Sequence, residues 1–442
     1  MNKNGTPEDK STGGRQKKFL FVSKEALIGD VCWEVMKEGH MVKYYIGKED
    51  QKDVCDGFVD KVDRWEDWID WADVIIFDDI GFGSIADKLR KEGKPVVGGS
   101  VYTDRLEDDR EFGQSELNSL GVPTLPNWNF TDFDEAIKFV EENLGRYVIK
   151  PSGKAQIDKE LLFIGNEEDG KDVVHMLGHY KRNWSRKIKS FQLQAFAPGV
   201  EIAVGAFFNG KDFIMPINVN FEHKRLFPGD LGPLSGELGT MMYWNYYPNK
   251  IFTNTLAKMK EKLAASGYTG YIDINCIANA KGIWPLEFTS RFGYPTISIQ
   301  MEGILTPISD FLYDLASGND FMLKTKKGFQ IGVVVAVPPF PFDDANAFRK
   351  YSEEAIVFFR KPNLDGVHLG DVKLAEDYDW KLAGNTGYAL IVTGSGDTVE
   401  TARKVAYQRV SNIMLPNMFW RNDIGVRWNK DSDRLQTWGY IY

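Results

Sequence analysis

The sequence has few of the features that mark secreted, membrane or nucleic-acid-coating proteins. It has only three cysteines in 442 residues, an odd and scattered set that argues against a disulfide framework and indicates a reducing compartment. No apolar run reaches the ~18 residues of a membrane-spanning helix, so we expect no membrane partner. Residues 1–17 are polar and lack an apolar core. They predict a disordered tail rather than a signal peptide, which favours a cytoplasmic protein.

Basic residues are also in the minority. Lys and Arg total 54 against 63 Asp and Glu, which gives a net charge of -9. This balance does not indicate a nucleic-acid-coating surface, and we expect no nucleic-acid partner. Local phosphate recognition is still compatible with an acidic protein. Hydrophobic residues make up 43% and charged residues 26%, which is typical of a globular protein with a large core. The length allows roughly three domains.

The N-terminal region lacks a GxGxxG fingerprint, so a dinucleotide site is not indicated. Short apolar runs nevertheless alternate with helical spacing over residues 18–120, which predicts a doubly wound parallel sheet in a Rossmann-like domain. Ligands bind at the carboxyl ends of the strands in such sheets. The turns that hold Gly81, Gly83 and Ser100 are therefore candidate phosphate or substrate cradles. Plain strand-to-helix turns are the alternative interpretation.

Residues 270–295 read as two short strands joined by a tight turn. Alternation gathers polar side chains on one face: Asp273 and Asn275 from the first strand, and Glu287, Thr289 and Arg291 from the second. Burying such a face is costly unless it holds a cation and phosphate oxygens. A solvated sheet face with a chance salt bridge is an equally supported alternative.

A polar loop between two strands forms a candidate lid. The strand at residues 147–150 ends in Lys150, and Lys159 closes the loop before the return strand at residues 161–164. Lysines in a mobile loop can neutralise a polyphosphate as the loop closes. An ordinary hairpin with exposed lysines is the alternative.

The rest of the chain divides into two further α+β units. Residues 121–327 contain the candidate lid (roughly 124–190), an antiparallel meander and a long glycine-rich loop at 228–239, a length that is usually functional. From residue 328 the pattern changes to short strands and a helix over residues 398–414. We expect residues 328–442 to form a C-terminal domain that closes over the second unit.

Several motifs occur in the order found in one enzyme family. They are Gly98-Gly-Ser100 with Leu106-Glu107, Leu120-Gly-Val-Pro-Thr124, Val148-Ile-Lys150, Glu222-His-Lys-Arg225, Gly229-Asp-Leu-Gly-Pro233, Ser235-Gly-Glu-Leu-Gly239, Glu287-Phe-Thr-Ser-Arg-Phe-Gly293 and Arg421-Asn-Asp-Ile-Gly425. In this order the chain resembles the glycinamide ribonucleotide synthetases, also called phosphoribosylamine–glycine ligases, of the ATP-grasp superfamily. The resemblance covers nearly the whole chain after the tail.

The resemblance implies an ATP-grasp fold and an ATP-dependent ligase that forms C–N bonds in purine biosynthesis. A carboxylate substrate attacks the γ-phosphate of ATP, and an amine then displaces phosphate from the acyl phosphate. The implied cofactors are ATP and Mg²⁺ (or Mn²⁺). The implied substrates are an amino acid and an amine, phosphoribosylamine in the family, and we expect a monomer or a homodimer.

Carried over residue by residue, the resemblance also implies the site. The ATP-binding residues would be Lys150, Lys159, Gln194, Phe196 and Glu201. Glu287 would be the main metal ligand, with Asn275 or Asp273. Arg291, Lys224 and Glu287 would act at the reacting groups. Substrate would contact Asp230, Ser235, Gly236 and Gly239, together with Gly81, Gly83 and Ser100.

The sequence departs from the family pattern in some binding loops. Thr289 stands where the family has a metal-binding asparagine, and Tyr294-Pro-Thr296 replaces an acidic DPE. A sister ligase that joins a different carboxylate and amine is therefore one alternative. A nucleotide-binding protein without catalysis is another. Phosphate release from ATP with defined substrate pairs distinguishes the three.

Overall fold

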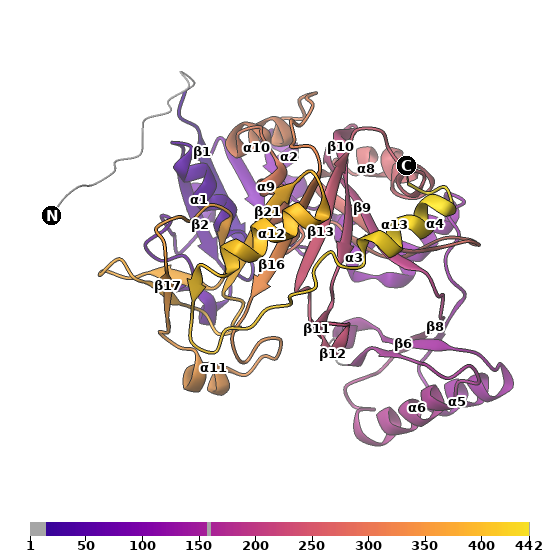
Figure 1. The fold of residues 1–442 in the computed structure, drawn as a ribbon. Helices are drawn as coiled ribbons and strands as arrows, with labels where there is room; N and C mark the ends of the chain where they lie inside the picture. The colour runs from indigo at the N-terminus through magenta and orange to yellow at the C-terminus, as the bar shows by residue number, and fades with distance from the viewer. Residues whose placement is uncertain (1–14, 157–160, 442) are drawn as a thin grey trace.

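The computed structural model describes residues 15–156 and 161–441. Its N-terminal part is a parallel sheet in the order β2-β1-β3-β4 (Figure 1, indigo), as the sequence predicts. The strands are β1 (Lys18–Ser23), β2 (Met41–Ile46), β3 (Val74–Phe77) and β4 (Val96–Val97). The helices are α1 (Gly29–Lys37), α2 (Gly83–Lys91), α3 (Val101–Asp108) and α4 (Arg110–Ser119).

The central strand β1 is buried on both faces, which explains its continuous apolar run. Phe19 and Phe21 point into the main core of the molecule. Leu20 and Val22 alternate with them and pack in a separate cluster with Leu89 of α2. Because successive side chains of a strand point to opposite faces, one face of β1 packs on the main body and the other packs on α2.

The main body is built on an antiparallel sheet of eight strands in the order β15-β14-β9-β10-β13-β16-β21-β18. Their bounds are β9 (Val200–Asn209), β10 (Phe213–Glu222), β13 (Gly239–Asn245), β14 (Thr269–Asn279), β15 (Gly282–Thr289), β16 (Phe329–Val335), β18 (Val367–Leu369) and β21 (Leu390–Gly396). The predicted boundary at residue 327 lies just before β16, so the sheet continues across it. Three short helical elements precede β14: α7 (Lys250–Asn254), η5 (Leu256–Met259) and α8 (Lys260–Ala265).

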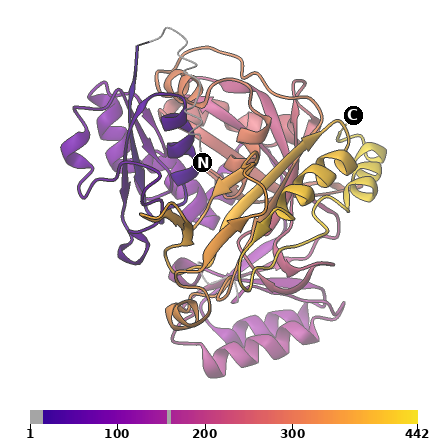
Figure 2. The ribbon, with the colours of Figure 1, turned by 60° about the vertical axis from the view of Figure 1, so that its left-hand side comes forward.

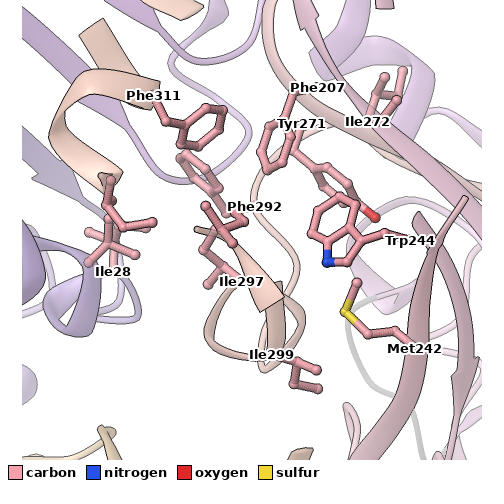
Figure 3. Close-up of a cluster of buried hydrophobic side chains, with 14 of the residues drawn as sticks. Ile28, Phe207, Met242, Trp244, Tyr271, Ile272, Phe292, Ile297, Ile299 and Phe311 are labelled. Carbon is pink, nitrogen blue, oxygen red and sulfur yellow. The ribbon is translucent and has the colours of Figure 1, made fainter. Parts of the chain in front are cut away.

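One face of this sheet packs on α9 (Thr296–Gly303) and α10 (Ile308–Ala316). Figure 3 shows Phe207, Tyr271, Trp244 and Met242 on the sheet side and Phe311, Ile297 and Ile299 opposite them. The rings of Phe207 and Phe311 are 4.6 Å apart, centre to centre. This packing fixes the positions of the ends of the strands. It therefore also fixes the positions of the polar residues at those ends.

The lid is a separate lobe at the bottom of Figure 1, and its two helices lie side by side in Figure 2. Its antiparallel sheet has the order β5-β8-β6-β7. The bounds are β5 (Asn127–Phe130), α5 (Phe133–Glu142), β6 (Tyr147–Pro151), η3 (Gly153–Gln156), β7 (Phe163–Ile164), α6 (Lys171–Asn183) and β8 (Phe191–Ala195). The lobe has its own apolar core, so it can move as a unit.

The long loop predicted over residues 228–239 is partly ordered as a hairpin. Strands β11 (Arg225–Phe227) and β12 (Leu231–Leu234) form a two-stranded sheet. The predicted long loop is therefore shorter than expected, because the positive φ of Gly229 and Asp230 allows a tight turn between the two strands. Figure 1 places this hairpin between the main sheet and the lid.

The C-terminal part adds a small mixed region and two helices across the main sheet (Figure 1, yellow). The remaining elements are η1 (Glu49–Gln51), η2 (Glu66–Trp68), α11 (Ala345–Tyr351), β17 (Ile356–Phe359), β19 (Val372–Leu374), β20 (Trp380–Leu382), α12 (Val399–Val410), β22 (Ile413–Met414) and α13 (Trp428–Thr437). None of the helices described is both long and apolar enough to cross a bilayer. The three cysteines are buried and unpaired.

Candidate active site

A cavity of about 530 Å³ lies between the lid sheet and the polar end of the main sheet. The lid contributes Lys150 from β6 and Gln194 from β8, and the main sheet contributes Glu201, Glu222 and Glu287. Residues far apart in the sequence therefore face one enclosed space. The predicted basic lid and acidic hairpin meet there.

Apolar side chains from both sheets and their flanking segments form part of the cavity wall: Leu125, Val148, Leu162, Ile164, Phe196, Ile277 and Leu286. The guanidinium of Arg146 covers the ring of Phe196 at 3.7 Å. The amide nitrogen Nε2 of Gln194 is buried and donates no hydrogen bond. An apolar slot with one unpartnered polar group is suited to a flat heteroaromatic ring that offers an acceptor.

Two basic groups also line the cavity. Burial, together with the nearby charges of Arg110 and Lys224, lowers the pKa of Lys150 to about 7, although Glu287 opposes the shift. The sequence reasoning missed Arg110, whose Nη1 donates to the carbonyl of Pro151 at 3.2 Å. The sequence signal for Arg110 was a basic residue at the start of a helix, directly after the capping residue Asp109. Two cations in a closed space favour a polyanion such as a nucleotide phosphate chain.

The hairpin β14–β15 presents its polar face to these cations. The strand register places Asn275 directly opposite Glu287, and Asp273 opposite Thr289. Arg291, the fifth residue predicted on this face, lies beyond the end of β15. The amide of Asn275 donates to Glu222 at 3.0 Å and to Glu201 at 3.3 Å. Its oxygen Oδ1 is buried and accepts no hydrogen bond.

Lys224 lies at the centre of the acidic part of the site. Its Nζ is 2.9 Å from Glu201, 3.2 Å from Glu222 and 3.5 Å from Glu287. Burial alone would lower the pKa of this lysine, but the three carboxylates raise it well above its usual range. The sequence reasoning missed Glu222 as a site residue, although it follows Asn218 and Asn220 on alternate positions of β10. That polar alternation on a buried strand was the available signal.

Asp273 lies deeper than the sequence analysis proposed. It is not among the residues that line the cavity, and only 4% of it is exposed. Burial, together with the charge of Glu222, raises its pKa to about 8. Asp273 is therefore placed to accept hydrogen bonds inside the sheet, from Tyr271 and Thr289, rather than to reach the cavity.

Arg291 points towards the N-terminal sheet. It pairs with Asp79 at 3.3 Å and with Glu107 at 3.2 Å, and it lines a second cavity of about 140 Å³ next to Glu287. The two carboxylates hold its guanidinium between α3 and the end of β3. Arg291 thus joins the main sheet to the carboxyl ends of the parallel strands.

The glycine-rich segment contributes Asp230, Ser235 and Gly236 to the cavity wall. Gly239 does not line the cavity: its backbone packs so closely on β16 that a Cβ would lie 2.5 Å from the carbonyl oxygen of Gly332. Asp230 accepts from the fully buried Arg421 at 3.1 Å. The C-terminal segment therefore supports this wall of the site.

The predicted cradle residues lie at the edge of the parallel sheet, outside the cavity. Ser100 is fully buried and caps the N-terminus of α3 by accepting from Thr103. The amide of Gly83 donates to Asp104 at 2.8 Å, and Gly81 has a φ of 93° next to Lys24. Lys159 lies outside the described residues.

The oxygen donors fit a hard divalent cation. Glu222 and Glu287 line the cavity with carboxylate oxygens, and Asn275, which is 4% exposed and does not line the cavity, offers an amide oxygen beside Glu222. These are the ligands that Mg²⁺ and Mn²⁺ prefer. The unpartnered Oδ1 of Asn275 is an orphaned acceptor in the same cluster. Within residues 15–156 and 161–441, no three acidic, imidazole or thiol groups converge closely enough to hold a metal ion by themselves.

The chain is similar to known proteins of the family that its motifs resemble. Residues 108–297 match the family model for the phosphoribosylglycinamide synthetase ATP-grasp (A) domain. This segment is an ATP-grasp domain of that family. The family resemblance inferred from the motifs is confirmed.

Named relatives extend the similarity beyond the ATP-grasp domain. The chain is 27% identical to phosphoribosylamine–glycine ligase of Streptococcus pneumoniae over 362 residues, covering 79% of this chain and 82% of the relative. The crystal structure of phosphoribosylamine–glycine ligase from Thermotoga maritima superposes with a TM-score of 0.69 at 19% identity, over 92% of this chain and 100% of the other. Biotin carboxylase from Campylobacter jejuni has the same fold, with a TM-score of 0.61 at 13% identity, over 95% of this chain and 96% of the other.

The ATP-grasp assignment explains the two-lobed site. The lid sheet and the main sheet supply two walls of the cavity. Lys150 comes from the lid and Arg110 from α4, whereas the acidic groups lie on the main sheet. The predicted fold class is confirmed.

Proposed function

We propose that this chain is an ATP-dependent carboxylate–amine ligase of the phosphoribosylamine–glycine ligase type. The observation that carries the proposal is one cavity lined by Lys150 of the lid and Glu287 of the main sheet. A polyanion with its metal fits between a basic and an acidic wall. The adenine occupies the apolar slot near Gln194 and Phe196, and Glu201 binds the ribose hydroxyls.

The reaction has two steps. The carboxylate oxygen of the first substrate attacks the γ-phosphorus of ATP, the bond to the β-bridging oxygen breaks, and ADP leaves. The amine nitrogen of the second substrate then attacks the acyl carbon, inorganic phosphate leaves with the electrons of the C–O bond, and the nitrogen loses a proton. Both steps move negative charge between phosphate oxygens, so positioned cations supply most of the catalysis.

The chain's own residues position these groups. Lys150 of the lid and Arg110 of α4 neutralise the phosphate chain. Glu287, with Asn275 and Glu222, holds Mg²⁺ or Mn²⁺, which neutralises phosphate oxygens and aligns them when it is bound. Lid closure over the cavity excludes water, which would otherwise hydrolyse the acyl phosphate.

Glycine and phosphoribosylamine are the first substrate pair to test. The named activity of the relatives supports this pair. The loop with Asp230, Ser235 and Gly236 lies next to Lys224 in the cavity and would face the acyl phosphate and the amine. Arg291 lies at the junction with the parallel sheet, where the amine substrate would enter.

A ligase with a different amine is the second candidate. The strand ends nearest Arg291 are acidic: Asp78 is buried with a pKa that burial raises to about 7, and Asp79 pairs with Arg291. Carboxylates at this edge favour an amine or hydroxyl group over a phosphate ester. This observation points to an amine substrate without a 5′-phosphate.

Phosphate release from ATP and Mg²⁺ tests the proposal. The assay includes glycine with phosphoribosylamine generated in place, and then a panel of amino acids and amines. Turnover that needs both glycine and phosphoribosylamine supports the first candidate, and turnover with another pair supports the second. Nucleotide binding without turnover on any pair contradicts ligase activity.

A further inference from the structure

The ammonium of Lys224 occupies the point where three carboxylates converge. The glutamates come from three strands, Glu201 from β9, Glu222 from β10 and Glu287 from β15, and each lies within 3.5 Å of its Nζ. Carboxylates this close repel one another strongly in a partly buried site. The ammonium of Lys224 lies among them and offsets this repulsion.

Two of these carboxylates have other partners in the proposed reaction. Glu201 binds ribose hydroxyls and Glu287 binds the metal, so neither can keep its ion pair with Lys224 throughout. The backbone of Lys224 is anchored, because its carbonyl accepts from the amide of Ser235 at 2.8 Å and from its hydroxyl at 3.0 Å. The flexible four-carbon side chain can therefore change partners without moving the backbone.

We propose, on the basis of the proposed function, that Lys224 is the resident cation of the metal-free site. Its ammonium moves to the phosphates when nucleotide binds, and this frees Glu222 and Glu287 for the divalent metal. Glu222 is then a metal ligand that compensates for Thr289. The metal binds together with the nucleotide and not before it.

The amide of Asn275 supports this order of binding. Its nitrogen donates to Glu222 while its oxygen is buried without a partner. Turning the amide over would aim the oxygen at the carboxylates, which is favourable only with a metal ion between them.

Metal binding to the nucleotide-free protein tests the proposal without relying on activity. Binding of Mn²⁺ is measured at pH 8 from the loss of the free Mn²⁺ electron paramagnetic resonance signal, for wild type, Lys224→Met and Lys224→Gln. We expect weak binding by wild type and at least tenfold tighter binding by both variants. We expect the gain to disappear in the double variant Lys224→Met/Glu222→Gln.

Lys326→Met is the matched control, because Lys326 also pairs with a buried glutamate, Glu302, at 3.1 Å but lies outside the nucleotide cavity. Its Mn²⁺ affinity should equal that of wild type. Equal Mn²⁺ affinity in wild type and the folded Lys224 variants would overturn the proposal. Tight Mn²⁺ binding by wild type, or an equal gain in Mn²⁺ affinity in Lys326→Met, would also overturn it. A gain that persists after Glu222→Gln would overturn the role of Glu222. Binding of ATP, measured separately, shows whether the nucleotide site itself fails.

Discussion

Lys150 and Glu287 line the same cavity although they belong to different sheets and are separated by most of the ATP-grasp domain. Lys150 lies on β6 of the lid, and Glu287 lies on β15 of the main sheet. Burial lowers the pKa of Lys150, and the negative charge of Glu287 raises it by less, so the net pKa is about 7. The basic and acidic walls are therefore coupled before any nucleotide binds.

Replacing Glu287 with Gln should reduce phosphate release by roughly 10²–10³-fold, because a neutral amide is a poor ligand for Mg²⁺ and no longer balances the cations around the phosphates. Steady-state phosphate release with the active substrate pair measures the effect. The exposed Glu376 provides the control, and Glu376→Gln should retain full activity. Unchanged turnover in Glu287→Gln would remove the proposed metal site.

Nucleotide binding should take up a proton above pH 7. Lys150 has a pKa of about 7 in the free protein, so it is charged below pH 7 and mostly neutral at pH 8. Phosphates favour the charged lysine, and binding at pH 8 therefore draws close to one proton from solution, whereas binding at pH 6 draws much less. Calorimetry in buffers of different ionisation enthalpy measures this uptake. Lys150→Arg stays charged and should show none; equal uptake in that variant would assign the proton to another group.

Asp230→Asn should loosen the glycine-rich wall while the fold stays intact. Asp230 accepts from Arg421 at 3.1 Å and from Arg427 at 3.3 Å, whereas Arg421 keeps its partner Asp423 at 2.7 Å. We expect turnover to fall by roughly ten- to a hundredfold through misplacement of the wall. The free energy of unfolding should change by less than about 1 kcal/mol.

Hydrogen exchange across residues 223–239 provides the structural measurement for Asp230→Asn, and we expect faster exchange there. Asp433→Asn, on the exposed side of α13, is the matched control. A fall in activity without faster exchange in this segment would contradict a positioning role for Asp230.

The Glu302 carboxylate should stabilise the fold above pH 4.5 and lose that effect in acid. Burial raises its pKa, but Arg409, Ser395 and Lys326 outweigh burial and lower it from 4.5 to about 2. Because the folded pKa is depressed, the contribution is complete above pH 4.5 and disappears as the pH falls through 2. Glu302→Gln should cost on the order of 3 kcal/mol at pH 7.

Urea unfolding of wild type and Glu302→Gln between pH 7 and pH 2 checks this dependence. The difference in unfolding free energy between the two proteins should shrink as the pH falls below 4.5. A difference that stays constant down to pH 2 would show that Glu302 acts through packing rather than through its charge.

Local patterns in the sequence determined the hairpin and much of the parallel sheet. The two-residue period of β14 places Asp273 and Asn275 on one face, as the sequence predicts. The turn alone would pair Asn275 with Leu286, but an irregularity between Asn275 and Cys276 shifts the register and places Glu287 opposite Asn275. The apolar runs of β1 and β3 likewise predicted buried parallel strands. Family motifs added the identity of the lid lysine Lys150.

Tertiary structure decided which charges meet. Lys224 has partners on three strands, and the distance between Glu201 and Glu287 in the sequence gives no information about the register that joins them across β9 and β14. Arg110 reaches the cavity only because α4 packs beside β15. Conversely, Ser100 and Gly83 carry the composition of a ligand cradle, but packing uses them to cap and seat helices. Periodicity is a local property, whereas the convergence of charges depends on how distant strands are ordered in a sheet, and that order is fixed by the packing of the whole core.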